Sequence, residues 1–221
     1  MRRLLAMAGL MVVLLAGAFG FLVWKASNRK PRIADVVPKV LTFEDVLRRN
    51  SASPLPLGRG FEWQYRFAEK TEDRRITGSS TAPDNSPHFE LTAGVGLKYE
   101  FRATQSAILL VGQTRGVDVI IFNPPIRFLP TPLAGADTWE YQGEAGRADG
   151  SGSERWKLKF STELETLELP AGQFRCVAVT TTGSRGLTEV KEKHWYAPGV
   201  GLVRYLIGND DFKLVRHQLG R

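Results

Sequence analysis

A cysteine, a histidine and two glutamates are the residues whose types and spacing best suit catalysis. Cys176 is the only cysteine of the chain, and His194 is the first histidine that follows it. A base that removes the proton of a thiol makes it a nucleophile, so this pair could serve a hydrolase. Glu163 and Glu165 stand at positions i and i+2, so in a strand they would share one face, as an acid and base pair requires.

The sequence around these residues favours structural roles. Cys176 lies within 174–179, where apolar residues fall on both faces of an expected strand, and this is typical of a buried, inert thiol. Glu163 and Glu165 follow a lysine-rich strand and precede Glu168, which indicates a solvated face. We therefore expect that the protein is not an enzyme, with an unrecognised hydrolase as the catalytic alternative.

Metal, cofactor and phosphate sites are not indicated. The histidines, none of which has a second His or a Cys at metal-ligand spacing, are His88, His194 and His217. Gly94-Val95-Gly96 lacks the third glycine of a phosphate-binding loop, and no Gly-x-Ser-x-Gly elbow is present. We expect no cofactor and no metal ion.

Aromatic residues and glycines form the clearest pattern in the second half of the chain. The aromatic side chains that we consider as candidates for binding an apolar ligand are Phe128, Trp139, Tyr141, Trp195 and Tyr196. Proline sets φ and glycine accepts positive φ, so the residues expected to form structural turns are Pro170, Gly172, Pro198, Gly199 and Gly201.

The elements that position these residues are β-strands. From Phe61 onward apolar and polar residues alternate, most clearly at 61–67, 97–102 and 156–161. Turn signals separate such runs at intervals of roughly 8–12 residues, which indicates an all-β, antiparallel domain. We expect ten to twelve strands in a curved sheet, as a half-barrel or a barrel, because so long a sheet must curl or close.

One segment departs from this alternation. Residues 122–133 contain four prolines among large apolar side chains. Proline cannot donate to a sheet ladder, so the segment is expected at an edge or in a crossover. Two interpretations remain open: a connector whose apolar residues plug the core, which we favour, and a lid over an apolar cavity.

The N-terminus predicts a membrane anchor. Leu4 to Trp24 is uncharged, and as a helix it would be about 31 Å long, which matches a hydrocarbon core of ~30 Å. We expect three parts: an anchor at 1–24, a basic, proline-containing tether at 25–60 with a short amphipathic helix at 41–49, and an extracytoplasmic β-domain at 61–221. Cleavage after Ala18 would instead release the protein, but the apolar run continues beyond it.

The distribution of charge argues against nucleic acid as a partner. Residues 25–60 hold eight Lys and Arg against three Asp and Glu, whereas residues 61–221 hold twenty of each. The basic excess therefore flanks the anchor, where it would attract anionic lipid, and the β-domain is neutral. The expected location is the inner membrane of the cell, with a single span and the β-domain in the periplasm or outside the cell.

Three segments resemble a known group of proteins. Trp-x-Tyr at 139–141, Leu-Pro-Ala-Gly-x-Phe-x-Cys-Val-x-Val at 169–179 and Trp-Tyr-Ala-Pro-Gly-Val-Gly-Leu-Val at 195–203 are similar, in this order, to exported bacterial proteins of unknown function. Those proteins are expected to have antiparallel sheets curved like the lipoprotein carriers LolA and LolB. The resemblance, over roughly residues 137–207, implies an extracytoplasmic β-domain with a hydrophobic concave face and implies no catalytic residue.

These observations leave two non-catalytic functions. The first is a tethered envelope module that binds an apolar ligand, such as a lipid, or an acylated partner, such as a lipoprotein. The second is a scaffolding or protein-interaction domain with a filled core. A cavity of the size usual for ligands, ~300–1,000 Å³, would favour the first.

Overall fold

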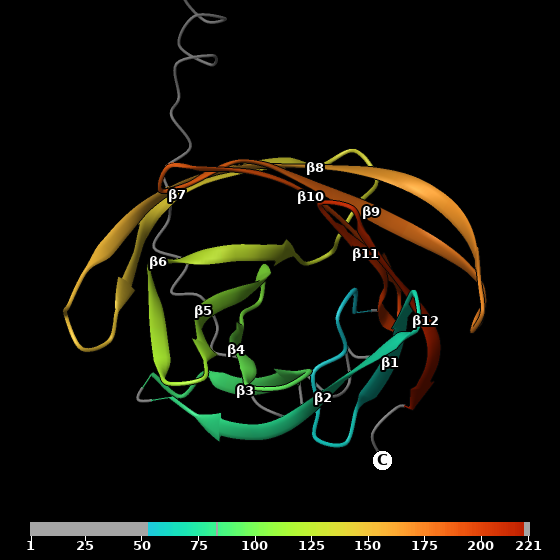
Figure 1. Ribbon diagram of the computed structural model, residues 1–221, viewed down its shortest axis with the longest axis horizontal. Coiled ribbons are helices and arrows are strands. Elements are labelled where there is room, and N and C mark those ends of the chain that lie inside the picture. The colour runs from blue at the N-terminus through green and yellow to red at the C-terminus, as the bar shows by residue number, and fades with distance from the viewer. Residues whose placement is uncertain (1–52, 83, 219–221) are drawn as a thin grey trace, which may run out of the picture. The chain divides into compact units, whose positions relative to one another are not determined.

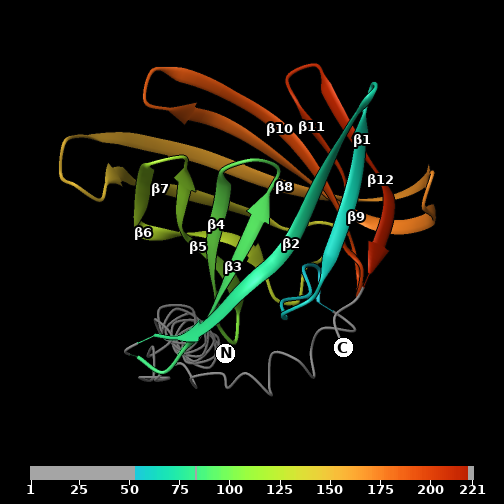
Figure 2. The same ribbon diagram turned by 60° about the horizontal axis from the view of Figure 1, so that its bottom comes forward.

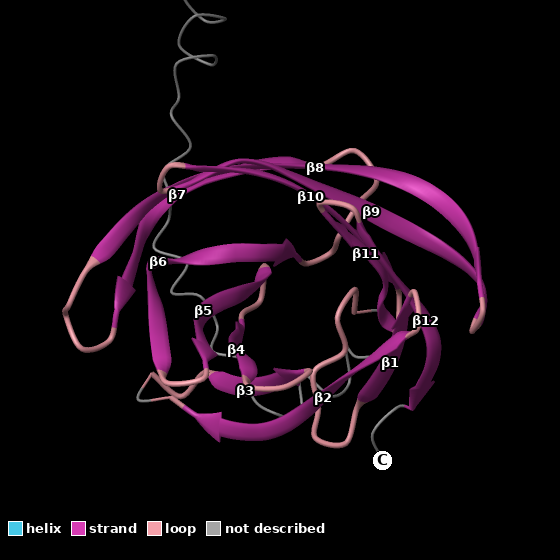
Figure 3. Ribbon diagram, viewed as in Figure 1, coloured by secondary structure: helices cyan, strands magenta, loops and turns pink. Residues whose placement is uncertain are grey.

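The computed structural model describes residues 53–82 and 84–218, in which every regular element is a β-strand (Figure 3). In chain order the strands are β1 (Glu62–Phe67), β2 (Lys70–Thr81), β3 (Pro87–Ala93), β4 (Leu97–Ala103), β5 (Ala107–Arg115), β6 (Asp118–Pro130), β7 (Thr138–Arg147), β8 (Ser153–Leu169), β9 (Gly172–Arg185), β10 (Thr188–Ala197), β11 (Gly201–Ile207) and β12 (Asp210–Gln218).

The predicted N-terminal elements fall outside this part of the chain. The expected span Leu4–Trp24 and the expected amphipathic helix at 41–49 lie outside the described residues. Among the residues that the structure does describe, no helix is long and apolar enough to cross a bilayer.

The twelve strands of the described residues form one closed, antiparallel barrel (Figures 1 and 2). Each strand pairs with its neighbours in sequence, and β1 closes the ring by pairing with β12. The predicted all-β barrel of ten to twelve strands is therefore confirmed. The half-barrel alternative is wrong, because β1 pairs with β12 and closes the sheet into a ring.

Alternation along each strand divides its side chains between the lumen and the outside. Phe101 on β4 is in register with Phe89 on β3 and Leu110 on β5, and all three are buried. Lys98 and Glu100, on the opposite face of β4, are exposed. The period of two that is visible in the sequence is thus the inside and outside pattern of the barrel wall.

The two ends of the barrel differ. The connections that follow β1, β3, β5, β7, β9 and β11 are short and form the turn end, toward the top and left of Figure 2. The opposite, closed end is covered by residues 53–61: Leu55 and Leu57 are buried, and the Gly199 amide donates to the Ser53 carbonyl oxygen at 3.0 Å. The last part of the segment expected as a tether therefore contributes to the core of the barrel.

The proline-rich segment is the second half of β6. Only Ile120–Asn123 of this strand pair with β7, so residues 124–130 have β5 as their one neighbouring strand, as an edge segment with prolines requires. Two aromatic side chains of β7 bridge the gap. Trp139 Nε1 donates to the Arg127 carbonyl oxygen at 2.8 Å, and the Tyr141 hydroxyl donates to the Pro124 carbonyl oxygen at 3.0 Å.

The predicted turn residues lie at the closed end. Pro170 is in the connection between β8 and β9, and Gly172 opens β9 with φ of 128°. Pro198 and Gly199 lie between β10 and β11, and Gly201 opens β11 with φ of 102°. A Cβ atom on Gly201 would also lie 3.1 Å from Nε1 of Trp63, so both backbone conformation and space require glycine there.

Candidate functional site: the barrel lumen

The lumen of the barrel contains a cavity of about 490 Å³. Its wall is built from residues of β1 to β11, with Leu55 at the closed end. At the turn end the lining includes Asp118 and Arg147, whose side chains are 48% and 51% exposed. The cavity is therefore covered at the closed end and opens to solvent at the turn end.

The deep part of the lumen is apolar. The buried residues that line it near the closed end are Leu55, Phe101, Leu110, Ile126, Leu129, Phe160, Val179 and Leu202. Ile126 and Leu129 belong to the proline-rich half of β6, so this segment forms part of the cavity wall. Such a surface is suited to hydrocarbon rather than to a charged group.

Aromatic residues form a middle layer. The Tyr65 hydroxyl donates to the Leu202 carbonyl oxygen at 2.7 Å, and the Tyr205 hydroxyl donates to Oε1 of Glu72 at 2.8 Å. The imidazole ring of His194 lies between Tyr196 and Tyr205, with ring centroids 6.4 and 6.1 Å away. Burial raises the pKa of Tyr65, Tyr196 and Tyr205, so these phenols stay neutral at physiological pH.

Ion pairs lie between this layer and the mouth. Arg185 binds Glu192 through both terminal nitrogens, at 2.8 and 3.0 Å. Arg147 binds Asp118 at 2.9 Å.

A further pair is shielded by aromatic rings. Nε of Arg74 donates to Oε1 of Glu72 at 2.7 Å, and its guanidinium lies 4.1 Å from the centroid of the Tyr205 ring. Pairing each of these cations with a carboxylate offsets part of the cost of placing charge in the wall of the lumen.

His194 is held neutral inside the lumen. Burial lowers its pKa to about 4; nearby Arg74 and Arg185 act in the same direction, and Glu192 opposes them. The wall around it therefore offers a neutral imidazole beside the ion pair of Arg185 with Glu192.

The five aromatic residues considered for ligand binding lie in three different places. Phe128 and Tyr196 line the cavity. Trp139 and Tyr141 seal the gap between β6 and β7 through the hydrogen bonds described above. Trp195 is not in the cavity wall: it shares a row with Ala178 and Glu163 on the face of the sheet opposite to the lumen.

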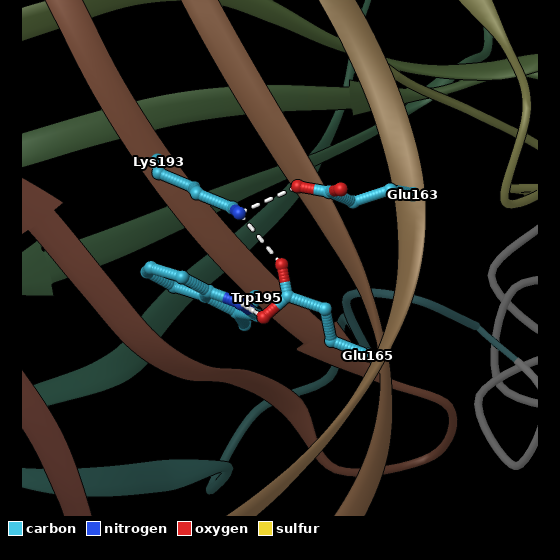
Figure 4. Close-up of polar contacts among 4 residues, drawn as sticks. All are labelled: Glu163, Glu165, Lys193 and Trp195. Atoms are coloured by element: carbon cyan, nitrogen blue, oxygen red, sulfur yellow. Dashed lines mark hydrogen bonds and ion pairs between the residues drawn. The ribbon is translucent and has the colours of Figure 1, made fainter.

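On that outer face, Glu163 and Glu165 are held by one lysine (Figure 4). Nζ of Lys193 donates to Glu163 at 2.5 Å and to Glu165 at 2.6 Å, and Nε1 of Trp195 donates to the second oxygen of Glu165 at 2.8 Å. Burial alone would raise the pKa of Glu165, but these two donors lower it below its usual value. Both carboxylates therefore belong to one hydrogen-bonded network on the outer face of the sheet.

Cys176 and His194 do not meet. His194 is in register with Val179, which lines the cavity, and Cys176 lies three positions earlier on β9, so alternation sends it to the other face. Cys176 is 1% exposed, and burial raises the pKa of its thiol to about 11. Within residues 53–82 and 84–218 no cluster of three His, Cys, Asp or Glu side chains could hold a metal ion.

The sequence did not single out Arg74, Trp156, Arg185 and Glu192, which line the lumen. In the sequence, the only indication that they face the lumen is their position at every second residue of a strand, as in Glu192-x-His194-x-Tyr196. In a two-layer protein, charged residues at such positions would mark the solvent face. Only closure of the barrel turns them inward, and closure depends on long-range pairing.

Comparison with known proteins adds little to this geometry. No protein-family model matches the sequence, and no curated protein matches it. A solved structure of a candidate lipoprotein from Parabacteroides distasonis is similar with a TM-score of 0.35 and 13% identity, over 75% of this chain and 98% of the other. A candidate exported protein with a YmcC-like fold from Bacteroides fragilis is similar with a TM-score of 0.31 and 12% identity, over 75% and 98% of the two chains. Similarities this weak do not indicate a function for this chain.

Proposed function

We propose that this protein is a membrane-tethered module of the cell envelope that binds an apolar ligand, or the acyl chain of an acylated partner, in its barrel without catalysis. The observation that carries the proposal is the unfilled lumen. A cavity of about 490 Å³ falls within the ~300–1,000 Å³ usual for ligand sites. A purely structural barrel gains stability by filling its interior with side chains, so an apolar space left empty favours a binding role over a scaffold.

The shape and polarity of the lumen support a chain-like apolar ligand. One end is covered by residues 53–61 and lined by hydrocarbon side chains, and the other end opens among ion pairs. A ligand that enters tail first would bury its hydrocarbon in the deep part and leave its polar end near the mouth.

The cellular location in this proposal rests on the sequence. The uncharged run Leu4–Trp24 would anchor the protein in the inner membrane, with the barrel in the periplasm or outside the cell. A tethered barrel would stay close to the membrane that supplies lipids or acylated proteins.

Photoaffinity labelling of the full-length chain in membranes tests the proposal. A palmitate analogue with a diazirine on its chain would be added, illuminated, and mapped by mass spectrometry on barrel peptides. We expect labelling of lumen-facing positions on β8 and β9. Val179→Phe, which places a ring in the apolar lumen, should reduce this labelling at least severalfold, and Leu110→Phe provides a second filling variant.

The matched control is Val119→Phe. This variant makes the same change from valine to phenylalanine on β6, but Val119 is 39% exposed and does not line the cavity. Labelling of the lumen should survive in this variant, and circular dichroism should show the same β-content in all of them. Barrel labelling that is absent, or equal in the filling variants and the control, would contradict ligand binding in the lumen.

A further inference from the structure

Trp156 and Arg185 form a distinct pair on the wall of the cavity. They are register partners on β8 and β9, and the guanidinium of Arg185 lies 4.9 Å from the centroid of the Trp156 indole. Along β8, Trp156 is followed on the same face by Leu158 and Phe160, which lie deeper in the lumen. The pair therefore stands where the apolar lumen meets the mouth.

Each member of the pair has a buried N–H without an acceptor. The terminal nitrogens of Arg185 bind Glu192, which leaves its Nε unpaired, and Nε1 of Trp156 is also unpaired. Trp156 itself is only 8% exposed. Buried donors without partners are costly, and native proteins supply an acceptor, whether from the protein, water or a ligand.

Trp156 is the exception among the tryptophans that the structure describes. The indole N–H groups of Trp63, Trp139 and Trp195 donate to Val200 O, Arg127 O and Glu165 Oε2, at 2.6, 2.8 and 2.8 Å. The fold thus satisfies three indole donors, including that of Trp63, which also lines the cavity. The unpaired indole N–H belongs to Trp156, whose side chain lines the cavity next to the unpaired Nε of Arg185.

We propose that Trp156 and Arg185 bind the oxygen atoms of the carboxylate or ester at the head of a long acyl chain, whose tail fills the apolar lumen. This proposal rests on the proposed function and specifies its ligand: the polar end is a hydrogen-bond acceptor, and the tail is hydrocarbon. The guanidinium is already neutralised by Glu192, so the site suits the oxygens of a carboxylate or of an ester and not a multiply charged group. A free fatty acid and an acyl ester of a lipid or lipoprotein share this chemistry.

The test compares three diazirine probes of equal chain length on the full-length protein in membranes: a fatty acid, its methyl ester and the corresponding alkane. The readout is the ratio of acyl to alkane labelling in the lumen. Trp156→Phe keeps an aromatic ring but removes the donor, so we expect this ratio to fall roughly two- to tenfold, as for one lost hydrogen bond. Partitioning of each probe into the membrane is the same for all variants and cancels.

Trp139→Phe is the matched control. It also removes an indole donor from the barrel wall, but that donor is already bonded to Arg127 O, so the acyl-to-alkane ratio should stay as in the wild type. If Trp156→Phe lowers the ratio for both the fatty acid and the methyl ester, the site accepts a carboxylate or an ester. If it lowers the ratio for the fatty acid alone, the site binds a carboxylate.

Two failures can be told apart. Equal lumen labelling by alkane and acyl probes, or a ratio unchanged by Trp156→Phe, would overturn the acyl site, with an ordered water as the acceptor, while ligand binding in the lumen would stand. Absence of lumen labelling by every probe would overturn the proposed function as well.

Discussion

At the scale of single residues, the lumen changes the chemistry of groups that look ordinary in the sequence. In the sequence, His194 is a histidine on an expected strand, considered only as a possible base for Cys176. In the barrel its ring is enclosed by tyrosines and faces two arginines, so its protonated form is disfavoured. Stability should therefore depend on pH through this residue.

We expect His194 to make the barrel less stable as pH falls from about 6.5 to about 4. Its pKa is near 6.5 in the unfolded chain and about 4 in the barrel, so within this window only the unfolded state binds the proton. The loss approaches about 3 kcal/mol at the acid end. His194→Asn cannot titrate, so urea unfolding at pH near 7 and near 4.5 should give a smaller difference in free energy than in the wild type. Equal differences would show that the imidazole is hydrated in the cavity.

Cys176 should be an unreactive thiol. It is 1% exposed and its pKa is raised to about 11, so little thiolate forms at neutral pH. Because it is the only cysteine, alkylation by iodoacetamide reports on this site alone. Labelling should be slow in the folded protein and fast in denaturant, and fast labelling in both would reopen the hypothesis of a hydrolase.

At the scale of elements, local pattern and long-range pairing contribute differently. Strand type and the number of strands could be predicted because alternation and turn residues are local, as at 61–67 and around Pro170. The sequence could not predict that residues 124–130 form half of a strand. Prolines argue against a strand unless one of its edges is unpaired. The lumen charges were missed for a related reason: whether Arg185 faces water or a cavity depends on closure by β1 and β12.

The aromatic bridge between β6 and β7 can be tested by removing single donors. Trp139→Phe should lower the free energy of unfolding by about 1–3 kcal/mol, because it leaves the Arg127 carbonyl oxygen without its partner. Trp156→Phe is the matched comparison: its indole N–H has no acceptor, so removing it should cost little or even stabilise the barrel. Urea unfolding of both variants measures this, and equal losses would mean that the bridge is only hydrophobic packing.

At the scale of the whole molecule, the barrel is asymmetric along its axis. The strands pair around the ring, and Trp139 and Tyr141 bridge the one gap beside residues 124–130, so the ends decide what can enter the lumen. Residues 53–61 cover one end and contribute Leu55 to the cavity wall, whereas short turns surround the other. Under the proposed function, a ligand would therefore enter at the turn end and leave its polar end there.

If residues 53–61 are part of the barrel, Leu57→Ala should destabilise the whole domain. Leu57 is 1% exposed, and truncation of such a leucine costs about 2–5 kcal/mol. Leu187→Ala is the matched control, because Leu187 is fully exposed in the turn between β9 and β10 and its truncation should change stability by less than about 0.5 kcal/mol. Both would be measured by urea unfolding, in which a single transition with an unchanged slope is expected. A loss as small for Leu57 as for Leu187 would make this segment a tether only, and the lumen would then be accessible from both ends.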